Sequence, residues 1–197
     1  MAVKTNALSI PFSRRLLIAG VLTGFGGFFG VPFHLLQLGA IWTPLFIPIG
    51  IAACMVEPYL AILAAMIIPL LSGLQTGMPS FTPPFIWLVG TEAVIFGIII
   101  SLFRFKLHYS RRISVLSGVL AGKLGLFLYV FLMGHPSPEA HYGALTARMA
   151  DGNLWLMTAP WKSVLSGMPG ALLVLLAVPF IVKLIEEHAG TDGLAAA

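Results

Sequence analysis

Long runs of apolar residues, interrupted by glycine, proline and charged positions, dominate the chain. These runs occupy residues 15–32, 42–56, 58–74, 83–103, 113–133 and 169–185. A membrane-spanning helix needs about 20 mostly apolar residues, because the hydrocarbon core of a bilayer is about 30 Å thick. The pattern therefore predicts an all-α integral membrane protein with six transmembrane helices. The second and third helices are expected to be short and separated only by Glu57-Pro58.

The composition supports this interpretation. The chain has 197 residues, of which 58% are hydrophobic and only 9% are charged, too few polar groups to cover a soluble globule. Most connections between the runs are short, which predicts one membrane domain over residues 1–197. The exception is one long loop at 134–168, which we expect on the outer side. The net charge is +4. The basic residues lie beside apolar runs and not in a nucleic-acid-binding motif, so they indicate topology signals and contacts with anionic lipid.

Most Lys and Arg residues fall on one side of the membrane when the connections are assigned to alternate sides. One side carries Lys4, Arg14, Arg15, Arg104, Lys106, Arg111, Arg112 and Lys183, and the other carries Arg148 and Lys162. Short loops rich in Lys and Arg remain in the cytoplasm. We therefore expect both termini to be cytoplasmic.

Only two charged residues fall deep inside the predicted spans, Glu92 in the fourth and Lys123 in the fifth. Glu92 precedes Arg104 by 12 residues and Lys123 follows Arg112 by 11 residues. At about 1.5 Å per residue, both lie roughly 16 to 18 Å from the charged boundary, near the middle of the membrane. Ionisable groups at this depth are functional or paired.

Two interpretations of this pair remain open and are compatible. Opposite charges at one depth on consecutive antiparallel helices can form an ion pair that offsets the cost of burial and holds the helices in register. Alternatively, Glu92 or Lys123 faces a cavity that opens outward and contacts a polar or charged ligand.

Small residues form stripes on several predicted helices. Gly118, Gly122 and Gly125 lie on one face of the fifth span and predict close helix packing. In the first span Ala19, Gly20, Thr23 and Gly24 form overlapping pairs of small residues four positions apart. This flat surface suits either packing within the chain or docking of a partner subunit.

No motif for catalysis, nucleotide binding or metal binding occurs in the chain. It lacks an HExxH zinc motif and a GxSxG nucleophile elbow, and its histidines are not spaced as ligands on one helix. The single cysteine, Cys54, lies in an apolar segment and excludes a CxxC site. We therefore expect neither an enzyme nor a resident cofactor.

The order of several short motifs resembles the substrate-binding S components of energy-coupling factor (ECF) transporters, the micronutrient importers of prokaryotes. The motifs are Phe33-His34-Leu35-Leu36, Pro44-Leu45-Phe46-Ile47-Pro48, Pro69-Leu70-Leu71-Ser72 followed by Thr76-Gly77-Met78-Pro79, Glu92 with Phe96-Gly97, and Gly167-Met168-Pro169-Gly170 with Pro179-Phe180-Ile181-Val182. The resemblance spans roughly residues 15–183. Phe46 departs from it, because related sequences often have histidine there, and Glu57 replaces a common glycine.

The resemblance implies a six-helix subunit of the prokaryotic plasma membrane. Such a subunit binds a vitamin or precursor at the outer face and docks through its first helix on a transmembrane coupling subunit driven by two ATPases. We expect ligand contacts from Glu92, Thr91, Gln75, Trp87, Lys123, Trp155 and His34. The carboxylate favours cationic or amine-bearing groups and the indoles favour flat rings, so a nitrogen heterocycle fits.

An alternative function is a stand-alone channel or proton-coupled permease, in which Glu92 and Lys123 relay protons. Transport by the purified chain without an ATPase would favour this alternative.

Overall fold

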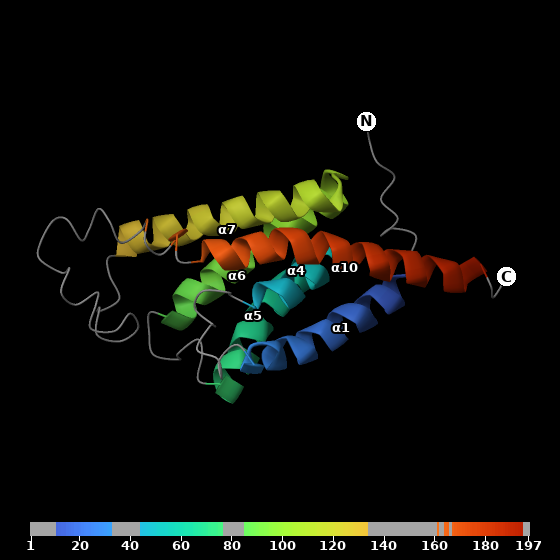
Figure 1. Ribbon diagram of the computed structural model, residues 1–197, viewed down its shortest axis with the longest axis horizontal. Coiled ribbons are helices and arrows are strands. Elements are labelled where there is room, and N and C mark those ends of the chain that lie inside the picture. Colours follow the sequence, from blue (N-terminus) through green and yellow to red (C-terminus); the bar gives the residue numbers. More distant parts are fainter. Residues whose placement is uncertain are drawn as a thin grey trace, which may run out of the picture.

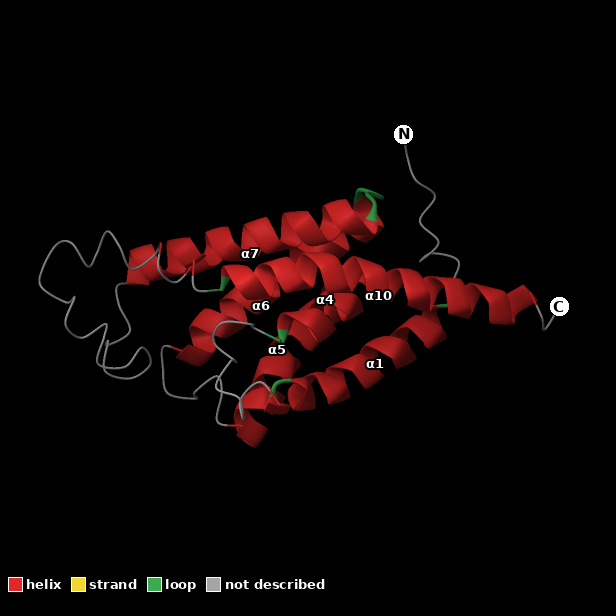
Figure 2. Ribbon diagram, viewed as in Figure 1, coloured by secondary structure: helices red, strands yellow, loops and turns green. Residues whose placement is uncertain are grey.

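The computed structural model describes residues 11–32, 44–76, 85–133, 161, 164–165 and 167–194. Throughout these ranges the regular structure is helical (Figure 2). The elements are α1 (Phe12–Phe29), α4 (Phe46–Met55), α5 (Pro58–Thr76), α6 (Phe85–Ser101), the π-helical turn η2 (Leu102–Lys106), α7 (Arg111–Met133) and α10 (Met168–Leu194). Each of the six predicted apolar runs overlaps one α-helix, so the all-α prediction is confirmed for the described residues.

Four helices in the described part of the chain are long and apolar enough to cross a membrane. Their spans are Pro58–Thr76, Ile86–Lys106, Arg111–Phe131 and Met168–His188. The chain is therefore a multi-pass membrane protein by the length and composition of its helices. α4 has only 10 residues, and α1 begins with Arg14 and Arg15 in its first turn. The count of six spans remains a prediction.

α4 is the centre of the bundle (Figure 1). It contacts α1, α5, α6, α7 and α10. All ten of its residues, including Gly50 and Cys54, are buried. A helix that is apolar on every face and too short to cross a bilayer alone is stabilised by such complete enclosure. The other helices form a shell around α4.

The outer faces of the shell are apolar. Large exposed side chains include Leu17, Phe25, Leu74, Leu176 and Phe180, each at least 60% exposed. A water-soluble protein of this size rarely exposes so many large apolar side chains. These side chains are placed to contact lipid tails.

Specific local features mark the turns between α4 and α5 and between η2 and α7. α4 ends at Met55, and the carbonyl of the next residue, Val56, accepts a buried hydrogen bond of 2.6 Å from the Ser101 hydroxyl of α6. Pro58 then begins α5, a position where its missing N–H is not needed. After η2, His108 adopts a φ of 55° and redirects the chain into α7.

The basic ends of the helices gather at one end of the bundle, where α1 and α7 begin and α10 ends (Figure 1). The carboxylate of Glu186 on α10 accepts hydrogen bonds from Arg104 of η2 and, at 2.5 Å, from Arg111 of α7. Glu186 and Arg104 are buried, whereas the Arg111 side chain is 31% exposed. This ionic cluster joins η2, α7 and α10 at the basic end.

Candidate functional site

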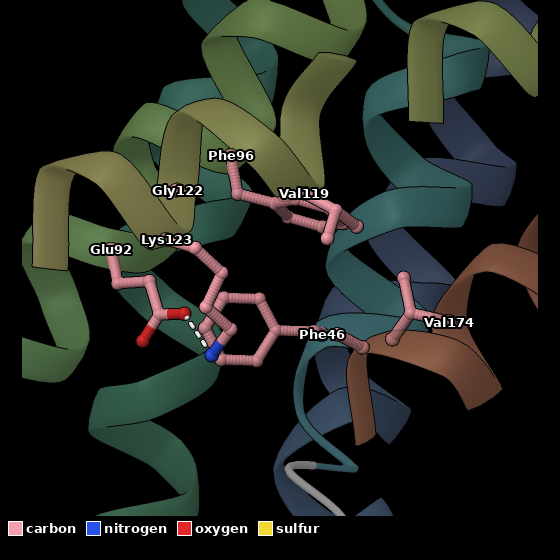
Figure 3. A pocket seen from close by; sticks show the side chains of 8 residues that line it. Phe46, Glu92, Phe96, Val119, Gly122, Lys123 and Val174 are labelled. Atoms are coloured by element: carbon pink, nitrogen blue, oxygen red, sulfur yellow. Dashed lines mark ion pairs between the residues drawn. The ribbon is translucent and has the colours of Figure 1, made fainter. Parts of the chain in front are cut away.

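The two charged residues deep in the bundle form an ion pair (Figure 3). Lys123 Nζ of α7 lies 2.7 Å from Glu92 Oε1 of α6. The Glu92 side chain is 8% exposed and that of Lys123 is 13% exposed. The ion pair, one of the two interpretations of these charges, is therefore present in the structure.

Glycines on α7 bring it close enough to α6 for this contact. A Cβ added at Gly122 would lie 3.4 Å from Phe96 Cβ and 3.5 Å from the Glu92 carbonyl oxygen, which is ordinary van der Waals contact. One added at Gly118 would lie 3.0 Å from the Phe96 carbonyl oxygen and would overlap Ile100. The predicted packing role of the glycine stripe is therefore confirmed, and it sets Lys123 beside Glu92.

The ion pair forms part of the wall of a cavity (Figure 3). The cavity is lined by Phe46, Glu92, Phe96, Val119, Gly122, Lys123, Ala171 and Val174. These residues come from α4, α6, α7 and α10. The rings of Phe46 and Phe96 meet edge to face with centroids 5.3 Å apart. The site thus combines two opposite charges with an aromatic wall.

The cavity is small as it stands. Its volume is about 20 Å³, enough for about one water molecule. Sites for drug-sized ligands have volumes of about 300 Å³ or more. A solute larger than water can enter only if the helices around the pair move apart.

Lys123 also contacts the segment that begins α10. A Cβ added at Gly167, one residue before α10, would lie 2.6 Å from Lys123 Nζ. The absence of a side chain at Gly167 therefore leaves the space that the ammonium group occupies. Through this contact the position of Lys123 is coupled to the start of α10.

The pair is costly to break because both charges lie in a low-dielectric interior. A single Lys or Asp at the centre of a membrane helix costs about 2.5 to 3.5 kcal/mol in insertion measurements. Removing one partner of a buried ion pair leaves the other charge uncompensated and costs about 3 to 5 kcal/mol. Any process that separates Glu92 from Lys123 must supply replacement partners for both groups.

The structure does not bring the other expected contact residues to this cavity. Thr91 is half-buried on α6 but does not line it. Trp87 is 64% exposed. Gln75 is exposed near the end of α5, with its Nε2 3.4 Å from where a Cβ of Gly27 would lie, so it belongs to the α1–α5 contact. His34 and Trp155 lie outside the described residues.

Sequence reasoning missed the apolar half of the cavity wall. Phe46, Val119, Ala171 and Val174 carry no chemical signature that separates them from other apolar residues of the spans. The one available signal was the departure of Phe46 from the motif on which the expected ECF resemblance rests. In this chain that position supplies an aromatic ring to the cavity.

The small residues of α1 divide between its two faces. Ala19 is 6% exposed and belongs to the core, and the Thr23 hydroxyl donates a 2.7 Å hydrogen bond to the Ala19 carbonyl oxygen. Gly20 and Gly24 are exposed, and a Cβ at either would meet nothing within 4 Å. The inner face instead uses Gly26 and Gly27 against Ile68 and Leu71 of α5. Packing within the chain is therefore confirmed for Ala19, whereas Gly20 and Gly24 lie on the outer face of α1.

No family model, curated protein or solved structure matches the chain. The fold and the site themselves define the class: an α-helical, multi-pass membrane protein with an ion pair and a small cavity in the interior of its bundle.

Proposed function

We propose that the chain is the substrate-binding S component of an ECF-type importer, and that its solute binds between Glu92 and Lys123. The observation that carries this proposal is the ion pair on the wall of the cavity. A pair that served only to hold α6 and α7 together would need no adjacent space. Here the two charges border the cavity that lies between α4, α6, α7 and α10.

The site favours a solute with a particular chemistry. Glu92 binds an amine or a protonated ring nitrogen, and Lys123 donates to a carboxylate or carbonyl oxygen. Phe46 and Phe96 contribute an aromatic wall that suits a flat ring. A nitrogen heterocycle that carries both a donor and an acceptor, such as a vitamin or its precursor, satisfies all of these groups.

Binding such a solute requires the pair to open. The solute inserts between Glu92 and Lys123 and replaces each charge's partner, so that neither is left uncompensated. α10 moves with this step, because Gly167 lies against the Lys123 ammonium. The closed cavity is then the form of the subunit without solute.

Uptake by this chain needs partners that supply energy, since its sequence contains no nucleotide-binding motif. The exposed apolar face of α1 around Gly20 and Gly24 is the proposed contact with a transmembrane coupling subunit, which two ATPases drive. In this arrangement the basic end of the bundle is cytoplasmic, both termini are inside, and the protein lies in a prokaryotic plasma membrane.

The proposal is tested by thermal unfolding of the detergent-solubilised chain against a panel of vitamins and precursors. A solute at 100 times its Kd stabilises the folded state by about 2.7 kcal/mol. We expect at least one nitrogen heterocycle to raise the unfolding midpoint of the wild type and of Glu187→Gln, a control that removes an exposed carboxylate far from the cavity. A panel that raises no midpoint contradicts the proposal.

A transport assay distinguishes an importer subunit from a stand-alone permease. The purified chain is reconstituted in liposomes with the panel solute outside, with and without a pH gradient. An S component binds the solute but does not accumulate it without its ATP-driven partners. Accumulation driven by the pH gradient alone would instead support a proton-coupled permease that uses Glu92 and Lys123.

A further inference from the structure

Arg15, in the first turn of α1, has an unusual environment. It is only 8% exposed. Its Nε and Nη1 atoms are buried and have no hydrogen-bond partner. Within the described part of the chain Arg15 takes part in no ion pair. Leaving a buried charged donor without a hydrogen-bond partner costs more than leaving a neutral one without a partner.

Two aromatic rings flank the guanidinium but do not satisfy these donors. Arg15 Cζ lies 5.8 Å from the centroid of the Phe12 ring and 5.4 Å from that of Phe105. Cation–π contacts stabilise the positive charge through the ring faces. The N–H donors of a guanidinium lie in its plane and need oxygen acceptors.

The acidic residues near the basic end are engaged elsewhere. Glu186 binds Arg104 and Arg111, and Glu187 pairs with Lys183. Glu57, before α5, forms no ion pair with Arg15. None of these three carboxylates therefore neutralises Arg15 by direct contact.

The first turn of α1 adds further donors at the same place. α1 begins after Pro11 without a side-chain cap. The backbone N–H groups of a first turn point outward and favour an anion. Arg14, beside Arg15, is exposed. An anionic group at this position would meet an uncapped helix start and the Arg15 guanidinium, with the exposed Arg14 adding only long-range attraction.

We propose that Arg15 and the start of α1 bind the phosphate group of an anionic phospholipid at the basic end of the bundle. The apolar surface beside Arg15 favours a lipid as the source of the phosphate. Leu16, Leu17 and Val21 are 44%, 68% and 52% exposed along the outer face of α1. Acyl chains can lie against Leu16 and Leu17 while the headgroup reaches Arg15, and the proposed contact with the coupling subunit at Gly20 and Gly24 lies further along the same face.

One of the two rings beside the guanidinium can move without a change in the core. Phe12 is the first residue of α1 and is 46% exposed, whereas Phe105 is 9% exposed and belongs to the bundle. Rotation of the Phe12 side chain would open that side of the guanidinium to a ligand. This site is at the basic end of the bundle, and it does not depend on the proposed transport function.

The test is native mass spectrometry of the delipidated, detergent-purified chain titrated with phosphatidylglycerol or with phosphatidylcholine. We expect a preference for phosphatidylglycerol. Arg15→Gln should weaken that binding by at least about tenfold, because it removes charged hydrogen bonds. The matched variant Arg14→Gln removes the same charge from an exposed position and should weaken binding by no more than about fivefold.

Three results would overturn the proposal. Equal losses of lipid affinity in Arg15→Gln and Arg14→Gln would show only diffuse electrostatic attraction to the basic end. The partner of Arg15 would then be an acidic segment of another protein. Displacement of the lipid by millimolar inorganic phosphate would make free phosphate the ligand. Absence of any preference for phosphatidylglycerol in the wild type, a measurement that does not depend on how the variants fold, would also exclude the site.

Discussion

Lys123 of α7 and Glu92 of α6 meet at 2.7 Å inside the bundle, with the ammonium group resting against Gly167 just before α10. One ion pair thus joins two neighbouring helices and is sensitive to the position of a third. The pair also borders the cavity whose aromatic wall is formed by Phe46 and Phe96. Stability and the proposed solute binding therefore depend on the same two charges.

Separate and combined removal of the two charges should have very different effects. We expect Glu92→Gln or Lys123→Met alone to lower the free energy of unfolding by about 3 to 5 kcal/mol, because the remaining charge stays buried without a partner. The double variant leaves no uncompensated charge and should recover most of the loss. Reversible unfolding of the detergent-solubilised variants measures this coupling. Additive losses in the double variant would show that the two charges do not act as a pair.

A side chain at Gly167 should weaken the pair without breaking the fold. The added Cβ of Gly167→Ala would lie 2.6 Å from Lys123 Nζ, so the flexible ammonium group must move away. We expect a lower unfolding midpoint in the wild-type background and almost no change in the Lys123→Met background. Gly122→Ala, whose Cβ finds its nearest neighbour at 3.4 Å, is the control. The same loss in both backgrounds would place the effect of Gly167 in the backbone and not in the ion pair.

The packing of α6 against α7 should be disturbed by a side chain at Gly118 but not by one at Gly90. A Cβ at Gly118 would press on the Phe96 carbonyl oxygen at 3.0 Å and on Ile100, so Gly118→Ala should destabilise the protein by about 1 to 3 kcal/mol. Gly90 on α6 has open space around its Cβ position. Gly90→Ala should be neutral or stabilise by about 0.5 to 1 kcal/mol, since alanine favours the helix. Thermal unfolding of the two variants in one detergent compares them, and equal effects would refute the packing explanation.

Glu186 and Glu187, near the end of α10, should contribute very differently to the stability of the fold. Glu186→Gln deprives the buried Arg104 and the half-buried Arg111 of their shared partner and should cost about 3 to 5 kcal/mol. Glu187 and Lys183 form an exposed pair of 3.6 Å, and Glu187→Gln should change stability by less than about 1 kcal/mol. Urea or thermal unfolding distinguishes the variants. A small effect of Glu186→Gln would mean that water reaches Arg104.

Much of the fold could be predicted because membrane helices leave a strong pattern in sequence. The run at 58–74 becomes α5 over Pro58–Thr76, and the run at 113–133 becomes α7 over Arg111–Met133. The π-helical turn at Leu102–Lys106 was not predicted, because one extra residue in a helical turn does not change the run of apolar residues. The burial of α4 on all sides could not be predicted either, since it depends on which helices become neighbours.

The candidate site also has a part that the sequence predicts and a part that it does not. Glu92 and Lys123 could be paired from sequence because a fixed rise per residue gives depth, and their equal depth required no knowledge of the rest of the fold. The contributions of Phe46 from α4 and of Ala171 and Val174 from α10 depend on helix adjacency, which apolar sequence does not encode. Trp87 and Gln75 were expected at the site from their chemistry, but the faces of α6 and α5 on which they lie point elsewhere.

The most direct test of the proposed solute site is the affinity of the best panel solute for the double variant Glu92→Gln/Lys123→Met, measured by isothermal titration calorimetry beside the wild type and Glu187→Gln. The double variant keeps the bundle free of uncompensated charge, so its folding and its binding can be judged separately. We predict a loss of affinity of at least about a hundredfold in the double variant, from two lost charged hydrogen bonds, and less than about twofold in Glu187→Gln. Unchanged affinity in a folded double variant would contradict the account and would leave Glu92 and Lys123 with a structural role alone.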